Sequence, residues 1–220
     1  MQKMTIQALN RLPYYLSHLK NLKRVGIEQA TATMLADELR LNEVVVRKDL
    51  SAIRTEKGKP NTGFPVQEMI LRIEDYLGYN NTTEAVLVGA GPLGRSLVTG
   101  MALDKFGMHI VAAFDEQPDL VGKELESVEI FPMSKLTNLC GRLHIQVGII
   151  AVPEQHAQGV CNLLVSGGIK YILNYAQVYL EAPEGVFIQN ENPAASVVAF
   201  LQHIRTEADA AGNGEEREEN

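Results

Sequence analysis

Three glycines and one aspartate form the stretch best suited to binding chemistry. Gly89, Gly91 and Gly94 follow an apolar run, and Asp115 ends a second apolar run about 20 residues later. The first glycine permits a tight turn, the second lets a pyrophosphate approach the backbone, and the third lets a helix pack close to a strand. Phosphates would lie at the positive end of that helix, and the carboxylate would accept hydrogen bonds from a ribose 2′-hydroxyl. The spacing therefore predicts a dinucleotide site. NAD(H) is favoured over NADP(H), because the carboxylate would repel a 2′-phosphate.

Strands and helices must hold these residues in place. Residues 84–88 are predicted to be a buried strand and residues 109–114 a second strand, with an apolar-periodic helix between them. Further strands are predicted at 128–131, 145–152, 169–173 and 186–188, and further helices at 134–140, with Ser134 as cap, and at 154–165. This alternation predicts an α/β, Rossmann-type doubly wound parallel sheet. Its ligand would bind at the carboxyl ends of the strands, beside the topological switch point.

Two segments leave the carboxyl ends of predicted strands. They are Val152-Pro153 and Asn174-Tyr175-Ala176, which are candidates for flanking the nicotinamide or are plain connections. The candidate cofactor-binding residues are thus Gly89, Ala90, Gly91, Pro92, Leu93, Gly94, Asp115, Val152, Pro153, Asn174, Tyr175 and Ala176.

The composition limits the classes of protein to consider. The 220 residues are 45% hydrophobic and 21% charged, enough for one large domain or two small ones. The net charge is −7, of which residues 1–80 contribute +3 and residues 81–220 contribute −10. A polyanion partner is therefore expected at the N-terminal part. Cys140 and Cys161 show no metal-ligand spacing and fit core thiols of a cytoplasmic protein. No signal peptide is visible, and no apolar run approaches the roughly 20 residues that cross a membrane.

The first eighty residues predict a helix-turn-helix. Residues 5–23 have a helical apolar period, and Pro13 predicts a break or a fresh start of the helix near Leu12. Thr31 would cap a short second helix, and Asn42 would cap a third helix at 43–53. Another amphipathic helix is predicted at 65–77, and the polar segment 78–83 marks a domain boundary, so domains are assigned at 1–80 and 84–190.

The third helix separates into two faces. Val46, Leu50 and Ile53 form the inward stripe. The outward face offers cations and a hydroxyl, as a recognition helix does, although helix surfaces commonly carry such residues and the three valines also permit a strand. The basic segment 54–64 resembles the wing of a winged helix. The candidate DNA-binding residues are Thr31, Val44, Arg47, Lys48, Ser51, Lys57, Gly58 and Lys59.

The C-terminal part has little sheet left to cover. A last helix is predicted at 193–205 with one apolar face, which suits packing on a partner subunit. Residues 206–220 are small and acidic and are expected to be disordered.

A nicotinamide enzyme needs, on the substrate side of its active site, a residue that acts as an acid or base and residues that bind the substrate. Only about 45 residues follow the fifth predicted strand, and the five histidines lack an evident carboxylate partner. His156 is the one candidate proton donor, and a surface or capping role suits it better. The sequence favours a binding protein over an enzyme. The alternative is a small NAD-dependent oxidoreductase with an N-terminal interaction domain.

Several motifs, in order, resemble the Rex family of redox-sensing transcriptional repressors over residues 4 to about 204. They are Arg11-Leu-Pro-Tyr-Tyr15, Val46-Arg-Lys-Asp-Leu-Ser51, Val88-Gly-Ala-Gly-Pro-Leu-Gly-Arg95, Ala113-Phe-Asp115, Val121-Gly-Lys123, Ala151-Val-Pro153 and Gly168-Ile-Lys-Tyr-Ile-Leu-Asn-Tyr-Ala176. The resemblance implies a homodimer whose winged helix binds a palindromic operator and whose Rossmann domain holds NAD(H). It also implies a C-terminal helix swapped onto the partner, and release of DNA when NADH binds.

Three positions depart from the family pattern. In the family a Tyr, an Arg and an Asp form a charge relay that differs between the two states, and the aligned residues here are Gly100, Ser17 and Asn192. The segment 54–64 also lacks the glycine- and aromatic-rich pattern of the family's wing. We therefore expect two binding modules that are coupled differently, or weakly, since coupling requires a contact that differs in free energy between the states.

Overall fold

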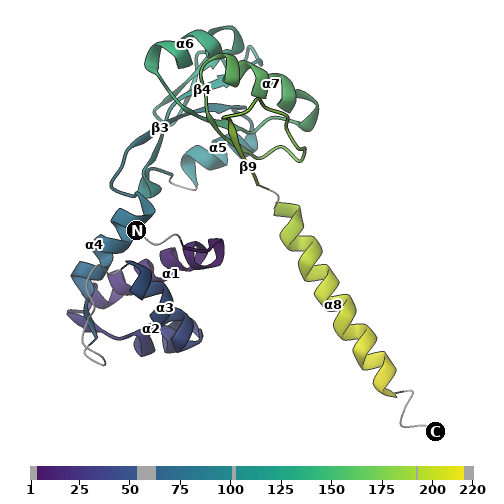
Figure 1. The fold of residues 1–220 in the computed structure, drawn as a ribbon. Coiled ribbons are helices and arrows are strands. Elements are labelled where there is room, and N and C mark those ends of the chain that lie inside the picture. The colour runs from purple at the N-terminus through teal and green to yellow at the C-terminus, as the bar shows by residue number, and fades with distance from the viewer. Residues whose placement is uncertain (1–3, 54–62, 101–102, 192, 216–220) are drawn as a thin grey trace. The chain divides into compact units, whose positions relative to one another are not determined.

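The structure, a computed structural model, describes residues 4–53, 63–100, 103–191 and 193–215 (Figure 1). Its described residues divide into two compact units. The first contains the chain up to Thr82 together with Asp104–Met108, and the second contains Thr83–Leu103 and everything from His109 onward.

The first unit contains four helices and a two-stranded ribbon, as a winged helix-turn-helix does. The helices are α1 (Ile6–Arg24), α2 (Ala32–Leu39), α3 (Glu43–Ile53) and α4 (Val66–Leu77), and the ribbon pairs β1 (Gln29–Ala30) antiparallel with β2 (Phe64–Pro65). The predicted caps are confirmed: the Thr31 hydroxyl accepts a hydrogen bond from the N–H of Met34 at 3.2 Å, and the Asn42 side chain accepts one from Val44 at 2.8 Å. The third helix is therefore a helix and not a strand.

The predicted break at Pro13 is wrong, because α1 runs through it. An internal proline costs about 3 kcal/mol, since it removes one backbone hydrogen bond and crowds the preceding turn. The helix buries Leu12, Tyr15, Leu16 and Leu19 to within 4% of complete burial. Each of these side chains contributes roughly 1.5–3 kcal/mol when buried, so packing outweighs the defect.

The second unit is built on a seven-stranded sheet with the order β5-β6-β4-β3-β7-β8-β9. Its strands are β3 (Thr83–Val88), β4 (Met108–Asp115), β5 (Glu124–Leu125), β6 (Val128–Pro132), β7 (Val147–Ile150), β8 (Tyr171–Asn174) and β9 (Phe187–Asn190). Its helices are α5 (Pro92–Thr99), α6 (Leu136–Leu143), α7 (Glu154–Ser166) and α8 (Pro193–Glu215), and it also contains the 3-10 turn η2 (Met133–Lys135). A second 3-10 turn, η1 (Leu103–Phe106), begins in this unit at Leu103 and continues in the first unit from Asp104. The fold class predicted from the sequence, a doubly wound α/β sheet, is confirmed.

The sheet order places a switch point between β3 and β7. From β3 the chain moves outward through β4 to β6, and it then returns to pair β7 in parallel with the other side of β3, with Val88 opposite Ile150. Because parallel strands share a carboxyl edge, the loops after β3, β4 and β7 meet there. The edge strand β5 pairs antiparallel with its neighbour, β6.

The helices predicted at 134–140 and at 193–205 both differ from the helices in the structure. The prediction that Ser134 caps a helix is wrong: Ser134 lies in the 3-10 turn η2, and α6 begins at Leu136 without a side-chain cap. The helix predicted at 193–205 is longer in the structure, where α8 continues to Glu215. The extension is rich in alanine, which has the highest helix propensity. Residues 216–220 lie outside the described residues.

The interior of the second unit accounts for both cysteines. Cys140 and Cys161 are free thiols, fully buried in one apolar cluster with strand residues such as Val86 and Ile150. Burial raises the pKa of the Cys140 thiol to about 11 and also raises that of Cys161. Among the described residues, no helix is long and apolar enough to cross a membrane, and no group of three or more metal-ligating side chains is present.

Candidate functional site

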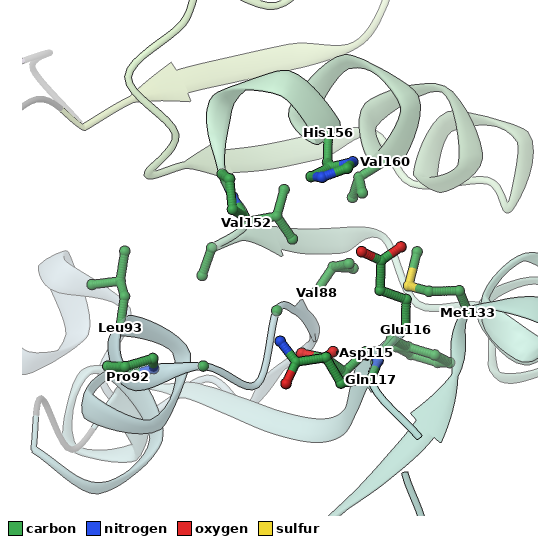
Figure 2. Close-up of a pocket in the computed structure, with 15 residues that line it drawn as sticks. Val88, Pro92, Leu93, Asp115, Glu116, Gln117, Met133, Val152, His156 and Val160 are labelled. Carbon is green, nitrogen blue, oxygen red and sulfur yellow. Dashed lines mark hydrogen bonds between the residues drawn. The ribbon is translucent and has the colours of Figure 1, made fainter. Parts of the chain in front are cut away.

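A cavity of about 580 Å³ lies at the switch point of the second unit. The loops after β3, β4 and β7 line it, together with η2 and the beginning of α7 (Figure 2). Its lining residues are Val88, Gly89, Gly91, Pro92, Leu93, Phe114, Asp115, Glu116, Gln117, Met133, Ala151, Val152, Pro153, His156 and Val160. Seven of the twelve candidate cofactor-binding residues belong to this set, so the sequence located the cavity.

The glycine loop has the geometry that its spacing predicts. Gly89 has a φ of 101°, and a Cβ there would collide with the carbonyl of Ala151. A Cβ at Gly94 would collide with the carbonyl of Gly89, so α5 packs directly on the turn. At Gly91, by contrast, a Cβ would meet nothing within 4 Å. The backbone is therefore open at Gly91, where a pyrophosphate would approach.

The helix after this loop begins without a side-chain cap. Gly91 is the N-cap residue of α5, and Pro92 occupies its first turn. Proline is favoured there because its missing N–H would have no partner within the helix. The remaining first-turn N–H groups, with the positive end of the helix dipole, suit an anionic ligand.

Asp115 closes the cavity from the end of β4. One carboxylate oxygen accepts a hydrogen bond from the N–H of Ala90 at 2.7 Å, and the other accepts one from the N–H of Gln117 at 2.9 Å. These bonds fix the carboxylate, which is only 7% exposed, against the glycine loop. Each carboxylate oxygen has a second lone pair, so the group can still accept a ribose hydroxyl.

Eight of the fifteen lining residues were not among the candidate cofactor residues, and three of these eight come from separate elements. Glu116 directly follows β4, Met133 lies in η2, and His156 lies on α7 (Figure 2). They come from three elements that the sequence separates widely, and only the sheet order brings those elements together. His156 is exposed and lines the cavity, and it forms no ion pair or hydrogen bond with a carboxylate of the described part of the chain.

Asn174 and its neighbours lie at the end of β8, outside this cavity. Asn174 is completely buried, and its amide donates to the carbonyl of Val178 and to the side chain of Asn190, both at 2.8 Å. Its oxygen accepts a hydrogen bond from the N–H of Ala176 at 3.0 Å. Asn174 thus shapes the loop that carries Tyr175 and Ala176, the two candidate residues that follow it.

The candidate DNA-binding residues of α3 lie on its outward face. Val44 is 74% exposed, and Arg47, Lys48 and Ser51 are exposed too, whereas Val46, Leu50 and Ile53 are buried. The hydroxyl of Ser51 donates to the carbonyl of Lys48 at 2.8 Å. The predicted separation of the two faces is therefore confirmed. Lys57, Gly58 and Lys59 lie outside the described residues.

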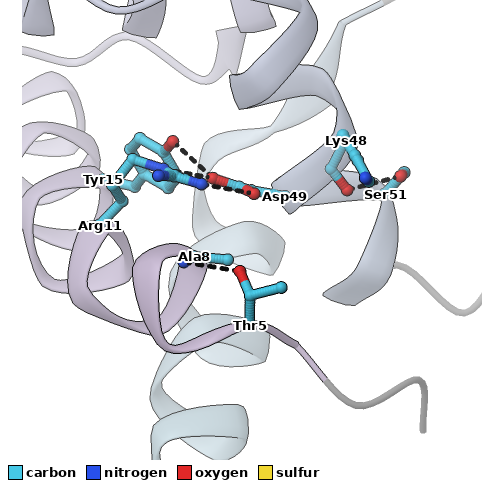
Figure 3. A network of polar contacts seen from close by, with 7 residues as sticks. All are labelled: Thr5, Ala8, Arg11, Tyr15, Lys48, Asp49 and Ser51. Atoms are coloured by element: carbon cyan, nitrogen blue, oxygen red, sulfur yellow. Dashed lines mark hydrogen bonds and ion pairs between the residues drawn. The ribbon is translucent and has the colours of Figure 1, made fainter.

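A buried network fixes the orientation of α3 (Figure 3). The guanidinium of Arg11 donates to both oxygens of Asp49, at 2.7 and 3.1 Å, and the hydroxyl of Tyr15 donates to one of them at 2.9 Å. Burial, followed by the hydrogen bond to Asp49, raises the pKa of Tyr15 to about 12. The bond to Asp49 also raises the pKa of Arg11. Residue types alone did not predict this network, because the three residues belong to two helices.

Comparison with family models gives two matches along the chain. A family described as "Putative DNA-binding protein N-terminus" matches residues 4–51, and one described as "CoA binding domain" matches residues 80–178. The first match covers α1 to α3. The second covers the glycine loop, Asp115 and the rest of the cavity.

Similar proteins and structures span nearly the whole chain. Proteins named redox-sensing transcriptional repressor Rex from Porphyromonas gingivalis and Bacteroides fragilis are 32% and 33% identical, over 90% and 89% of both chains. The crystal structure of RSP, a Rex-family repressor, in complex with NAD⁺ and operator DNA has a TM-score of 0.85 at 24% identity, covering 96% of this chain and 97% of that one. RSP in complex with NADH has a TM-score of 0.80, covering 96% and 99%.

Proposed function

The chain belongs to the Rex family of redox-sensing transcriptional repressors, and we propose that it binds operator DNA through α3 and releases it when NADH occupies the cavity of its second unit. One observation carries this proposal. A cavity of about 580 Å³ at a Rossmann switch point occurs in the same chain as a helix with an exposed cationic face. The first feature suits a dinucleotide and the second suits a duplex.

The cavity fits NAD(H) residue by residue. The open backbone at Gly91 and the first turn of α5 would hold the pyrophosphate, and the fixed carboxylate of Asp115 would hold a ribose. Val152 and Pro153 line the same cavity from β7. Ala90 and Gly94 would hold the loop in shape, Ala90 through its N–H bond to Asp115 and Gly94 through its close packing on Gly89. Tyr175 and Ala176 are the proposed neighbours of the nicotinamide.

DNA binding is assigned to residues 1–80 and NAD(H) binding to residues 84–190. Arg47 and Lys48 would contact phosphates or guanine edges, and Val44 and Ser51 lie on the same face. Thr31, which caps α2, and the segment with Lys57, Gly58 and Lys59 complete the proposed surface. A repressor must reach the chromosome, which supports the cytoplasmic location expected from the sequence.

We further propose a homodimer on a palindromic operator. In α8 the large apolar residues Val197, Val198, Phe200, Leu201 and Ile204 are all between 46% and 65% exposed. Such an uncovered face suits a second copy of the chain. Two copies would also double the phosphate contacts that a unit with a charge of +3 can make, which strengthens a modest electrostatic attraction.

We propose that the protein is not an enzyme. Among the described residues, His156 is the only histidine that lines the cavity, and it forms no hydrogen bond with a carboxylate that would orient it for proton transfer. The relatives carry the name of a repressor. The alternative, a small NAD-dependent oxidoreductase, predicts NADH consumption.

The decisive experiment measures binding to the protein's own promoter. Affinity is determined with saturating NADH and with saturating NAD⁺, beside an assay of NADH turnover. The proposal expects weaker binding with NADH and no turnover. Equal affinities would remove redox sensing and leave DNA binding intact. That result would fit the loss of the charge relay that the family forms at three positions. Ser17 is exposed on α1 and Gly100 is the C-cap of α5, whereas Asn192 lies outside the described residues.

A further inference from the structure

An acidic side chain occupies the outward face of α3, where DNA would lie. The guanidinium of Arg47 forms an ion pair and hydrogen bond with the carboxylate of Glu43, one turn earlier. Both side chains are accessible, at 67% and 37%. The cation that the proposed function places against DNA is therefore already paired in the free protein.

This pair affects non-matching and matching DNA differently. A phosphate on any sequence can attract Arg47 only by displacing the carboxylate, and Glu43 is itself repelled by the phosphate chain. A guanine edge offers more, because O6 and N7 accept two parallel hydrogen bonds from one guanidinium. The cost of opening the pair is the same in both cases. A phosphate can also accept two hydrogen bonds from Arg47, but it carries a charge that repels the neighbouring carboxylate of Glu43. The guanine edge is uncharged and is present at that position only in the matching sequence.

The place of Glu43 in the helix matters as well. In helix-turn-helix proteins the N-terminal residues of the second helix contact base edges. Glu43 is the first residue of α3, and a carboxylate there can accept a hydrogen bond from the amino group of cytosine. The carboxylate thus penalises backbone contact and permits one kind of base contact.

We propose that Glu43 is a specificity-determining residue, which withholds Arg47 from the phosphates of non-matching DNA. The inference rests on the proposed function, since it concerns the same DNA-binding face. It adds that the ratio of affinities for matching and non-matching DNA depends on this carboxylate.

The test compares Glu43→Gln with Glu68→Gln in the full chain. Glu68 forms the same kind of exposed i,i+4 pair with Arg72 on α4, at 2.7 Å, so its substitution removes an equal charge from the same unit. Two probes are used: a duplex that the wild-type protein selects from a randomised pool in the presence of NAD⁺, and a scrambled duplex of the same length and composition. Dissociation constants are measured over a series of salt concentrations.

We expect Glu43→Gln to bind the scrambled duplex more tightly, with a steeper salt dependence. The ratio of the two affinities should fall by roughly twofold per half-site, the size expected for one exposed i,i+4 pair, while Glu68→Gln keeps the wild-type ratio. An unchanged ratio in Glu43→Gln, or an equal fall in Glu68→Gln, would overturn the inference and leave the proposed function standing. A wild-type protein that selects no duplex from the randomised pool would overturn both.

Discussion

Asp49 of α3 accepts hydrogen bonds from the guanidinium of Arg11, which precedes it by 38 residues and lies on α1. The contact is bidentate, and the carboxylate is only 5% exposed. Lys48, directly before Asp49, and Ser51, two residues after it, are exposed. The buried carboxylate therefore fixes the rotation of α3 about its axis together with the buried side chains of Val46, Leu50 and Ile53.

We expect Asp49→Asn to destabilise the first unit by about 1–3 kcal/mol, because Arg11 and Tyr15 would lose charge-assisted partners in a buried setting. The measurement is urea unfolding of the full chain. Glu68→Gln is the control, and its exposed pair should cost about 0.5 kcal/mol or less. Equal losses in the two variants would show that the Asp49 network contributes no more than a surface pair.

Arg47→Ala should weaken binding to the selected duplex by about 1–3 kcal/mol if Arg47 reaches a guanine. Gel-shift titration with NAD⁺ present measures the change. Arg24→Ala removes an exposed cation from the end of α1 and serves as the control. A change within error for Arg47→Ala would mean that this side chain faces solvent in the complex.

Two glycines of the nucleotide loop should respond differently to alanine. Gly91→Ala is expected to fold normally, because its Cβ would meet no atom within 4 Å, and to bind NADH less tightly, because the methyl group would occupy the space of the pyrophosphate. Gly94→Ala should destabilise the second unit, since its Cβ would collide with the carbonyl of Gly89. Thermal melting and NADH titration separate the two effects. Tight NADH binding by Gly91→Ala would place the phosphates elsewhere.

Asp115→Ala should weaken NADH binding and relax the preference against NADPH. The carboxylate would no longer accept a ribose hydroxyl or repel a 2′-phosphate. The N–H of Ala90 would also lose its partner, so unfolding must be measured in parallel. Fluorescence titrations with both nucleotides provide the test. Unchanged curves for a folded variant would refute this role for the acid.

Cys140 should make the stability of the second unit depend on alkaline pH. Burial raises the pKa of its thiol to about 11, whereas the ordinary value is 9.0. Below pH 9 the thiol is protonated in both the folded and the unfolded state, so the full stability that comes from burying the neutral thiol is present. As the pH rises toward 11, the unfolded state ionises first, so stability is lost. The comparison is urea unfolding of the wild type and Cys140→Ala at pH 8 and at about pH 10.5. The variant should lose less stability between these two pH values, and equal losses would contradict the prediction.

The same burial predicts that native Cys140 and Cys161 resist a thiol reagent near neutral pH, because the thiolate is the reactive form. Both should react once the chain is unfolded. Rapid modification of the native protein would show that the cluster around them opens readily.

The sequence by itself determined the features that depend on near neighbours. The caps at Thr31 and Asn42, the bounds of α3 and the glycine loop with Asp115 follow from hydrogen bonds and backbone angles within a few residues, or from one strand-helix-strand unit. The alternation of strands and helices was equally visible, since each buried strand must be apolar.

Only the tertiary structure decided which distant residues meet. The sheet order brings Glu116, Met133 and His156 to one cavity, and helix packing joins Asp49 to Arg11. Packing also carries α1 through Pro13, where local preference predicted a break, and it directs the amide of Asn174 to its own loop instead of a ligand. These outcomes depend on contacts between elements that lie far apart in the chain, and residue types and spacing do not specify those contacts.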